Sequence, residues 1–459
     1  MSALLTVREP ARDVPVIRRA DVVVVGGGTS GICAALSAAR NGAHTVLIEQ
    51  GGFLGGNAAT WLPLLAFLDV HGNQIIRGIP QEIVDRLQAL GSTTQHYACA
   101  LHQSYTMYDP EALKLVAQQM LLEAGVDILL HTFASKVLVT GGHIRALLVD
   151  SKSGRGAVIG ANYVDCTGDG DIAAWAGAPF EVGDSQGAMQ PGTLIFTLRN
   201  VDVDTARKAI VDSPERFPIW VMPLTQYSER DHFMAVGFEP VVSQARAEGR
   251  FDVPQDRIIF TTLPTPGEVS INMTRVRGVD GTSVESLTHA EMTARAQIEP
   301  ILALLRHDVP GFENAILASS AHSIGIRETR RIMGEYVLNG EDVLEGMRFP
   351  DEVMLSGYMV DIHNPYDNQC SISLPKGAVG IPYRCLLPLR VENLLVAGRA
   401  ISTTHEAQGA VRVQPPCMAM GEAAGCAAAM SSAAKLTPRQ LDANNLRERL
   451  RQQGACLDA

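Results

Sequence analysis

Four consecutive apolar residues, at positions 22–25, run directly into a glycine-rich turn. A short, continuously apolar run is typical of a parallel strand that is buried on both faces. The Ala-rich stretch 32–40 predicts a helix, and residues 45–48 predict a second buried strand. This strand–helix–strand order is the βαβ unit of a doubly wound α/β domain.

The turn after the first strand has the spacing G-x-G-x-x-G, at Gly26, Gly28 and Gly31. The first glycine permits a tight turn, the second lets the backbone approach a pyrophosphate, and the third lets the helix pack closely on the strand. Glu49 ends the second strand, where a carboxylate accepts a hydrogen bond from a ribose hydroxyl. The pattern predicts a dinucleotide site with further contacts from Thr29, Ser30 and Gln50.

A second glycine turn, GGFLGG at residues 51–56, follows almost at once. A nicotinamide cofactor needs no second turn there, whereas a cofactor that continues past the pyrophosphate does. The segment resembles FAD-dependent oxidoreductases of the two-dinucleotide-binding-domain type, which include fumarate reductase flavoproteins and aromatic hydroxylases. That resemblance implies FAD, with its diphosphate and ribityl chain beside Gly55, Gly56 and Asn57.

Two later segments resemble the same group. The predicted strand 135–140 corresponds to one that presents backbone groups to the adenine, which implies a contact from Val137. Residues 163–171, YVDCTGDGD, end an apolar strand in T-G-D. They resemble the motif with which a strand returns beneath the FAD diphosphate, which implies contacts from Thr167, Gly168 and Asp169.

The C-terminal part contains a third block, in which a buried strand at 393–397 leads into Gly398 and Arg399. A loop through His405 and Gly409 is expected to reach the flavin, and a helix rich in small residues opens at Pro415. Glycines inside that helix each cost about 1 kcal/mol relative to alanine. They indicate close packing against a strand or the cofactor.

The three blocks together resemble the stand-alone FAD-dependent oxidoreductase family, related distantly to fumarate reductase and heterodisulfide reductase flavoproteins, over residues 21 to about 430. Members with covalent flavin carry a histidine before the second glycine turn, and residues 51–57 contain none, so we expect non-covalent FAD. The cysteine clusters of the heterodisulfide reductases are also missing from the sequence.

The predicted fold is α/β: a Rossmann-like FAD-binding domain with a parallel sheet, interrupted by a mixed β/α substrate-binding domain. We expect the FAD-binding domain at 1–183 and 376–459, with C-terminal helices, and the inserted domain at 184–375. Residues 1–19 predict an extended lead-in. In the inserted domain the pattern predicts strands at 192–198, 269–276 and 353–362, and helices at 205–213, 226–248 and 286–306.

Flavin chemistry needs a base near the ring when a substrate loses a proton with its hydride. His405 is the first candidate, and its alternative role is structural, through a bond to a backbone carbonyl. Arg412 is expected near flavin N1 and O2, where a cation stabilises reduced flavin. Its alternative is an ordinary ion pair.

Polar residues at predicted strand ends of the inserted domain form a second candidate set. Arg275 and Arg327 suit a carboxylate clamp, and His363 suits a second acid–base group. Arg327 and Arg330 are spaced for one helix face. Internal ion pairing between domains is the competing interpretation for each of them.

Composition limits the partners. The 459 residues carry a net charge of −11 and no basic run, which argues against nucleic acid and anionic membranes. No apolar run is long enough to span a bilayer, and the eight scattered cysteines form no C-x-x-C. We therefore expect a cytoplasmic protein with reduced thiols, no metal and a small-molecule substrate. Both a monomer and a homo-oligomer remain compatible with the sequence.

Three functions remain open at this point. The first is an FAD enzyme that transfers a hydride between a small organic substrate and flavin N5. The second is a flavin monooxygenase that uses NAD(P)H and O2, and the third is a flavin-bearing electron-transfer subunit. The missing cysteine clusters argue against the third.

Overall fold

The βαβ unit predicted from the first apolar run is present. Strand β1 (Val16–Val25), helix α1 (Thr29–Arg40) and strand β2 (Thr45–Ile48) follow in order, and the two strands are parallel with Val22 opposite Thr45. Residues 22–25 are buried, as a strand covered on both faces requires. Strand β1 begins earlier than the apolar run because its polar first half pairs with β9 at the edge of the domain.

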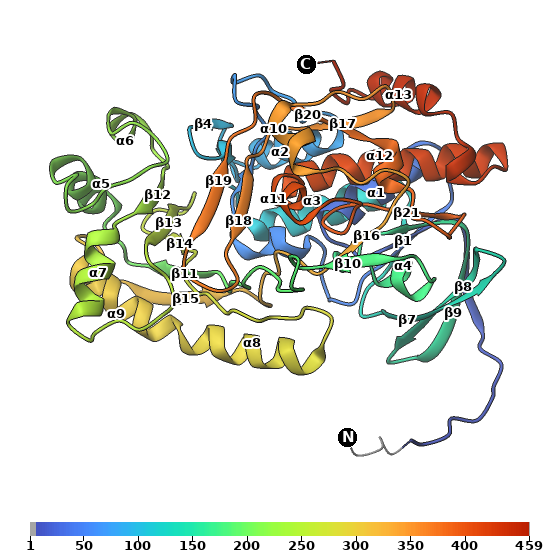
Figure 1. Ribbon diagram of the computed structural model, residues 1–459, viewed down its shortest axis with the longest axis horizontal. Helices are drawn as coiled ribbons and strands as arrows, with labels where there is room; N and C mark the ends of the chain where they lie inside the picture. Colours follow the sequence, from blue (N-terminus) through green and yellow to red (C-terminus); the bar gives the residue numbers. More distant parts are fainter. Residues whose placement is uncertain (1–5, 459) are drawn as a thin grey trace.

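The computed structural model describes residues 6–458, and its largest sheet has seven strands in the order β6-β2-β1-β9-β8-β7, with β21 also on β9 (Figure 1). Strands β6, β2, β1, β9 and β21 are parallel neighbours, whereas β9, β8 and β7 form an antiparallel meander. The remaining bounds are β6 (Asp127–Leu129), β7 (Phe133–Thr140), β8 (His143–Ser151), β9 (Gly154–Asp165) and β21 (Leu394–Val396). A Rossmann-like α/β fold is thereby confirmed.

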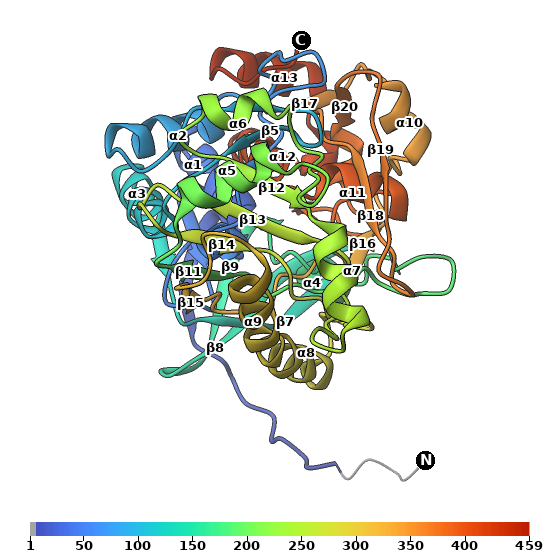
Figure 2. The same cartoon turned by 90° about the vertical axis from the view of Figure 1, so that its left-hand side faces the viewer.

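A second, five-stranded antiparallel sheet lies at the other end of the molecule, in the order β12-β13-β14-β11-β15 (Figure 2). Its apolar core is separate from that of the large sheet, and it also receives side chains from residues 97–107. The strands are β11 (Phe196–Arg199), β12 (Met234–Gly237), β13 (Ile258–Thr262), β14 (Val269–Ile271) and β15 (Ile316–Ser320). The helices around them are α5 (Val203–Asp212), α6 (Thr225–Glu229), α7 (Glu239–Ala247), α8 (Val284–Ala296) and α9 (Ile298–Asp308).

Four small antiparallel sheets complete the strands: β3-β5-β4, β10-β16, β17-β20 and β18-β19. Their bounds are β3 (Leu64–Leu65), β4 (Tyr97–Cys99), β5 (Gln103–Thr106), β10 (Phe180–Val182), β16 (Arg330–Ile332), β17 (Glu352–Ser356), β18 (Val360–His363), β19 (Cys370–Ser373) and β20 (Val379–Pro382). The β18–β19 hairpin stands between the two large sheets in Figure 1.

The remaining helices lie mainly on the side of the large sheet (Figure 1). They are α2 (Ile79–Ala89), α3 (Pro110–Glu123), α4 (Asp171–Trp175), α10 (Gly340–Glu345), α11 (His405–Val411), α12 (Gln414–Ala434) and α13 (Ala443–Gln452), with 3-10 turns η1 (Gly56–Thr60), η2 (Tyr383–Leu386) and η3 (Pro438–Gln440). Residues 6–15 form no regular element, and the first five residues of the predicted lead-in lie outside the described chain. Within residues 6–458 no helix is long and apolar enough to cross a membrane.

Several predicted elements of the middle region were wrong. The helix expected at 226–248 is α6, β12 and α7, because residues 234–237 pair with β13 and Phe238 turns the chain with φ 63°. The strand expected at 353–362 is two strands, β17 and β18. The helix expected at 286–306 is α8 and α9, with the break just before Pro300, which cannot donate to the preceding turn. Arg327 and Arg330 do not share a helix, because Arg330 begins β16.

Helix α12 packs in backbone contact with α1. A Cβ on Gly421 would lie 2.0 Å from the carbonyl oxygen of Ser30, and one on Gly425 would lie 2.0 Å from that of Ala34. Any side chain there would push the two helices apart, which explains glycines inside a helix. The close packing predicted for these glycines is therefore real, but the partner is a helix and not a strand or the cofactor.

Glu422 lies next to this contact and caps a different helix. Its Oε2 accepts a hydrogen bond of 3.1 Å from the backbone N–H of Ile79, at the start of α2, whose N-cap residue Gly78 has no side chain. Burial raises the pKa of Glu422 to about 8. The side chain is therefore a neutral acid near neutral pH and still accepts through its carbonyl oxygen.

This raised pKa predicts stability that falls with rising pH. The folded state binds the proton more tightly than the unfolded chain, so the contribution is complete below the unfolded pKa of about 4.3 and is lost as pH passes about 8. We expect the melting temperature of Glu422→Gln, which cannot ionise, to decline less than that of the wild type between about pH 6 and 9. Glu341→Gln, on exposed α10, is the control and should follow the wild type; parallel profiles of all three proteins would contradict the assignment.

Candidate active site

A cavity of about 970 Å³ opens where the carboxyl ends of β1, β2, β9 and β21 meet the five-stranded sheet. Open parallel sheets bind ligands at this edge because the loops that leave the strand ends converge there. The wall on the side of the large sheet comes from the glycine turns and the T-G-D segment. The opposite wall comes from β13, β14, the β18–β19 hairpin and residues 321–327.

The first glycine turn forms one end of the cavity. Gly26, Gly28, Thr29 and Ser30 line it, and Gly28 caps α1 without a side-chain hydrogen bond. The first amides of α1 are therefore available to an anion. Gly31 does not line the cavity. A Cβ there would lie 1.7 Å from the carbonyl oxygen of Gly26, so this glycine lets helix and strand touch.

The second glycine turn is docked on the first through backbone and carboxylate contacts. Gly55 donates 2.9 Å to the carbonyl of Gly27, and Glu49 accepts 2.6 Å bonds from the amides of Gly27 and Gly51. Glu49 thus ties both turns together, a role that the ribose prediction did not include. Of the predicted residues here, Glu49, Gln50, Gly56 and Asn57 line the cavity, and Gly55 lies behind them.

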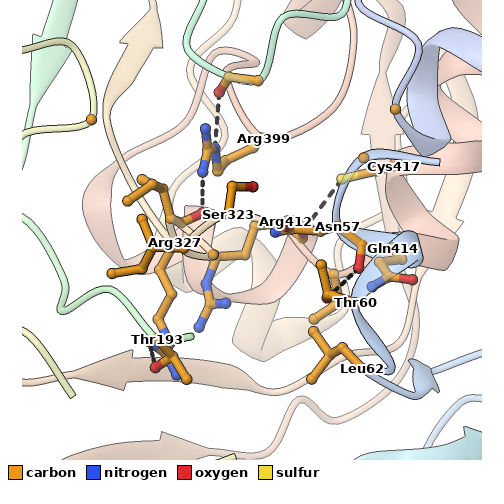
Figure 3. A pocket seen from close by; sticks show the side chains of 18 of the residues that line it. Asn57, Thr60, Leu62, Thr193, Ser323, Arg327, Arg399, Arg412, Gln414 and Cys417 are labelled. Atoms are coloured by element: carbon orange, nitrogen blue, oxygen red, sulfur yellow. Dashed lines mark hydrogen bonds between the residues drawn. The ribbon is translucent and has the colours of Figure 1, made fainter. Parts of the chain in front are cut away.

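The T-G-D segment enters the cavity at the end of β9. Thr167, Gly168 and Asp169 all line the wall, as do Gly398 and Arg399. Arg399 donates 2.9 Å from Nε to the carbonyl of Gly168 and 2.5 Å from Nη2 to Asp169 Oδ1, so it joins the ends of β9 and β21 (Figure 3).

Two further predicted cofactor contacts, besides Gly31 and Gly55, lie away from the cavity. Val137, within β7, is buried in the core, and the wall is instead contributed by Phe133 and Ala134 at the start of the strand and by Thr132 just before it. Gly409 faces β18, where its Cβ would lie 2.8 Å from the carbonyl oxygen of Asp361. Residues 405–411 were expected to be a loop and are helix α11, whose N-cap Thr404 accepts a bond from Ala407.

The start of α12 forms the wall between the two halves of the cavity. Arg412, Gln414 and Cys417 line it beside Asn57 and Thr60 (Figure 3). Pro residues occupy the first turn of α12 and no side chain caps it, so its positive end faces the cavity.

On the far wall, the β18–β19 hairpin presents an acid, a histidine and a thiol together. Asp361 Oδ1 lies 3.4 Å from Nε2 of His363 and 2.9 Å from Sγ of Cys370, and its Oδ2 accepts 3.0 Å from Nη2 of Arg412. The strand pairing sets His363 opposite Cys370. Cys370 was not among the predicted residues, because only the pairing of the two strands brings it to Asp361 and His363.

The charges in this cluster are strongly shifted. Burial lowers the pKa of His363 to about 4, and Arg327 adds to the effect. Burial alone would raise the pKa of Asp361, but His363, Arg412 and the thiol of Cys370 hold it well below its usual range. Near neutral pH the cluster thus contains a carboxylate, a neutral imidazole and a thiol whose pKa burial raises.

Arg275 holds the hairpin in place. Its Nη2 donates to the carbonyls of Asn364 (2.9 Å) and Asp367 (3.1 Å) in the hairpin turn, and its Nη1 lies 3.3 Å from His363 Nδ1. Most of its donors are used by the hairpin turn, and one of them contacts His363.

His405 is placed differently from the expectation. Its Nδ1 lies 2.8 Å from Oε1 of the fully buried Glu328, which Arg331 also contacts, and His405 is not among the residues that line the cavity. The imidazole is thus held in an internal ion cluster, and its partner is a carboxylate and not the backbone carbonyl of the alternative interpretation.

The ligand atoms of Asp361, His363 and Cys370 lie within 4.8 Å of one another, which a metal ion would require. Two of the three already take hydrogen bonds from arginines, and Arg275, Arg327 and Arg412 line the same wall. Their positive charge disfavours a bound cation, so we treat the cluster as an acid–base group.

Fold and site together define a dinucleotide-binding flavoprotein. A sequence profile described as FAD dependent oxidoreductase matches residues 21–450, and the chain belongs to this family. FAD is therefore its cofactor, and the uncapped α1 amides, the joined glycine turns and the positive end of α12 fit the phosphates and ring of such a group.

Other known proteins are similar over shorter or more divergent stretches. The thiamine thiazole synthase of Aeropyrum pernix is 32% identical over 133 residues, which span 29% of this chain and 44% of that one. A geranylgeranyl bacteriochlorophyll reductase-like protein of Thermoplasma acidophilum is 13% identical with a TM-score of 0.48, covering 95% and 82% of the two chains. GidA of Aquifex aeolicus is 16% identical with a TM-score of 0.48, and the match covers 91% of this chain and 64% of that one.

Gly28 allows a test that separates cofactor binding from folding. A Cβ there would meet only Gly56 Cα, at 3.9 Å, so the protein itself accommodates Gly28→Ala, whose methyl group would occupy the space over the α1 amides. We expect the apoprotein to melt at the wild-type temperature while FAD affinity falls about tenfold or more. FAD titration and apoprotein melting measure the two effects. Gly31→Ala should instead unfold the protein, and unchanged FAD affinity in Gly28→Ala would refute the site.

Proposed function

We propose that this FAD-dependent oxidoreductase exchanges a hydride with a small organic substrate and that His363 takes up the substrate's proton. The observation that carries the proposal is the Asp361–His363 pair, which faces the same cavity as the flavin cradle. A buried neutral imidazole beside a carboxylate is the pairing that general base catalysis uses.

Bound FAD supplies hydride transfer at its N5 atom. The protein must then accept the proton that the substrate loses and stabilise the resulting positive charge. Nη1 of Arg275 donates a long hydrogen bond of 3.3 Å to Nδ1 of His363, so the neutral imidazole carries its own proton on Nε2, and Nδ1 would take up a substrate proton in exchange for this contact. Asp361, on the Nε2 side, stabilises the imidazolium that results. Arg412 holds Asp361 in place and keeps a positive charge beside the start of α12.

The surroundings also suit a small substrate, since the far half of the cavity is lined by apolar side chains such as Leu101, Met234, Tyr358 and Met359. We further propose a cytoplasmic location, supported by eight cysteines that are all free thiols. A small molecule is the partner that this geometry supports.

Anaerobic reduction of the holoprotein tests the proposal directly. A panel of alcohols, amines, hydroxy acids and amino acids is mixed with oxidised enzyme, and the flavin absorbance is followed. Bleaching by at least one class, with release of the corresponding oxidised product, is expected. If none of them bleaches the flavin while NADH or NADPH does and a hydroxylated product forms in air, the protein is a monooxygenase instead.

Replacing His363 should slow the chemical step. We expect His363→Asn to reduce the rate of flavin reduction by about 10²- to 10⁴-fold, the usual effect of a lost general base. His102 lines the same cavity without a carboxylate hydrogen-bond partner in the described chain, and His102→Asn should change the rate only a few-fold. Equal effects of the two substitutions would exclude His363 as the base.

The pH profile gives a second readout. Because the pKa of His363 is lowered to about 4, the base is neutral and active above that pH, and kcat/KM should fall as pH decreases through about 4. Stopped-flow reduction after a brief pH jump measures this limb before acid unfolding intervenes. The limb should be missing in His363→Asn; its persistence there would assign it to another group.

A further inference from the structure

The far half of the cavity has an uncompensated positive charge. Arg275, Arg327 and Arg412 line it, and Asp361 is the one carboxylate that contacts any of these three in residues 6–458. Arg257, further along the wall, is already neutralised, because its Nε donates 2.6 Å to Asp256. Three guanidinium groups thus share a single buried counter-charge.

Arg327 is the member of this set that is left for a ligand. Its Nη1 donates to the carbonyl of Pro191 (2.6 Å) and to Oγ1 of Thr193 (2.8 Å), and these bonds fix the side chain (Figure 3). Within the described chain it makes no ion pair, and its Nη2 and Nε make no hydrogen bond. Figure 3 shows its guanidinium group and that of Arg412 directed into the same part of the cavity.

The other two arginines also have donors to spare. Nε of Arg275 and Nε of Arg412 are buried without a hydrogen-bond partner in the described chain. Burial lowers the pKa of Arg327 to about 10, and the nearby charge of Arg412 contributes. A half-buried cation without a counter-ion in a poorly solvated cavity is costly for the fold, and a bound anion would offset that cost.

We propose that the substrate is an organic carboxylate whose anionic group is bound by Arg327. The planar fork of an arginine, with Nη2 and Nε free, matches the two oxygens of a carboxylate. The rest of the molecule lies against the apolar wall formed by Leu101, Trp220, Tyr358 and Met359. His363 is on the same wall, within reach of the charge of Arg327. This inference rests on the proposed function, since it names the substrate class of the same site.

Equilibrium binding to the oxidised holoprotein tests the inference without turnover. The probes are acetate, benzoate, phenylacetate and succinate, each compared with its neutral amide, and binding is read from the flavin spectrum and by calorimetry. We expect at least one carboxylate to bind about tenfold or more tightly than its amide, an effect that one charge-assisted bidentate contact can supply. If no carboxylate binds better than its amide, the inference is overturned.

Variants then assign the contact. Arg327→Gln should abolish the preference for the carboxylate and leave amide binding unchanged, whereas Arg327→Lys should retain part of it. Arg199→Gln, at an exposed position at the end of β11, makes the same change in net charge and should behave as the wild type. A carboxylate preference that survives in Arg327→Gln overturns the assignment, and if that variant fails to fold, the wild-type comparison and Arg327→Lys decide.

The outcome is independent of the reaction. Acetate, benzoate and phenylacetate have no adjacent pair of C–H bonds to lose to a flavin, so their binding can succeed even if no compound bleaches the flavin. Conversely, bleaching by a neutral alcohol or amine, together with equal binding of acids and amides, would support the proposed function and overturn the carboxylate inference.

Discussion

Backbone contact between α1 and α12 is the constraint on which the rest of the site depends. Ser30, inside the first glycine motif, is enclosed by residues almost four hundred positions later: its carbonyl oxygen would lie 2.0 Å from a Cβ on Gly421, and its hydroxyl donates 3.0 Å to the carbonyl of Cys417. A Cβ on Gly398 would approach the same hydroxyl to 2.9 Å. Because no side chain fits between these segments, the amides of α1 and the first turn of α12 are held at a fixed separation. The cavity wall that receives the cofactor is therefore set by contacts of glycine and not by packing of large apolar side chains.

On the other wall of the cavity, the main constraint is electrostatic, because charged side chains there lie in a poorly solvated space. Arginines in such a place are tolerated only when their donors are used or a counter-charge is near. Arg275 meets this condition by holding the β18–β19 hairpin turn, and Arg412 meets it through Asp361. Arg327 meets it only in part, through one carbonyl and one hydroxyl. The three arginines therefore differ in how many of their donors the protein itself uses. Arg275 and Arg412 hold parts of the site in place, whereas Arg327 keeps donors for the ligand proposed above.

The parts of the site that could be predicted from sequence are those set by short-range patterns. The apolar run before Gly26 and the T-G-D segment each specify a backbone geometry locally and lead into the cavity wall, and the small residues of α12 predict close packing, which occurs against α1. Helix α11 could have been found from Thr404 as N-cap and Glu406 in its first turn. The Asp361–His363–Cys370 cluster could not, because it depends on the register between β18 and β19 and on the hold of Arg275 on their turn. His405 shows the converse error, since its neighbours in sequence suggested the flavin while its contact is the buried Glu328, distant in sequence.

The two walls also differ in how far their residues can be substituted without moving the backbone. Substitutions among the glycines of the cofactor wall would move backbones, so that wall tolerates little variation. The far wall is built from side chains on a hairpin and on the β13–β14 strands, and its charge can be altered without moving the large sheet. Arg275 lies just beyond β14 and holds the turn of the hairpin that carries His363, so it links the β13–β14 strands to the hairpin. A change of substrate could thus arise at Arg327 or among the apolar residues around it, whereas a loss of Arg275 would displace the acid–base pair itself. The reaction proposed above thus depends on side chains of the far wall, whereas the glycine turns, the T-G-D segment and the start of α12 form the opposite wall.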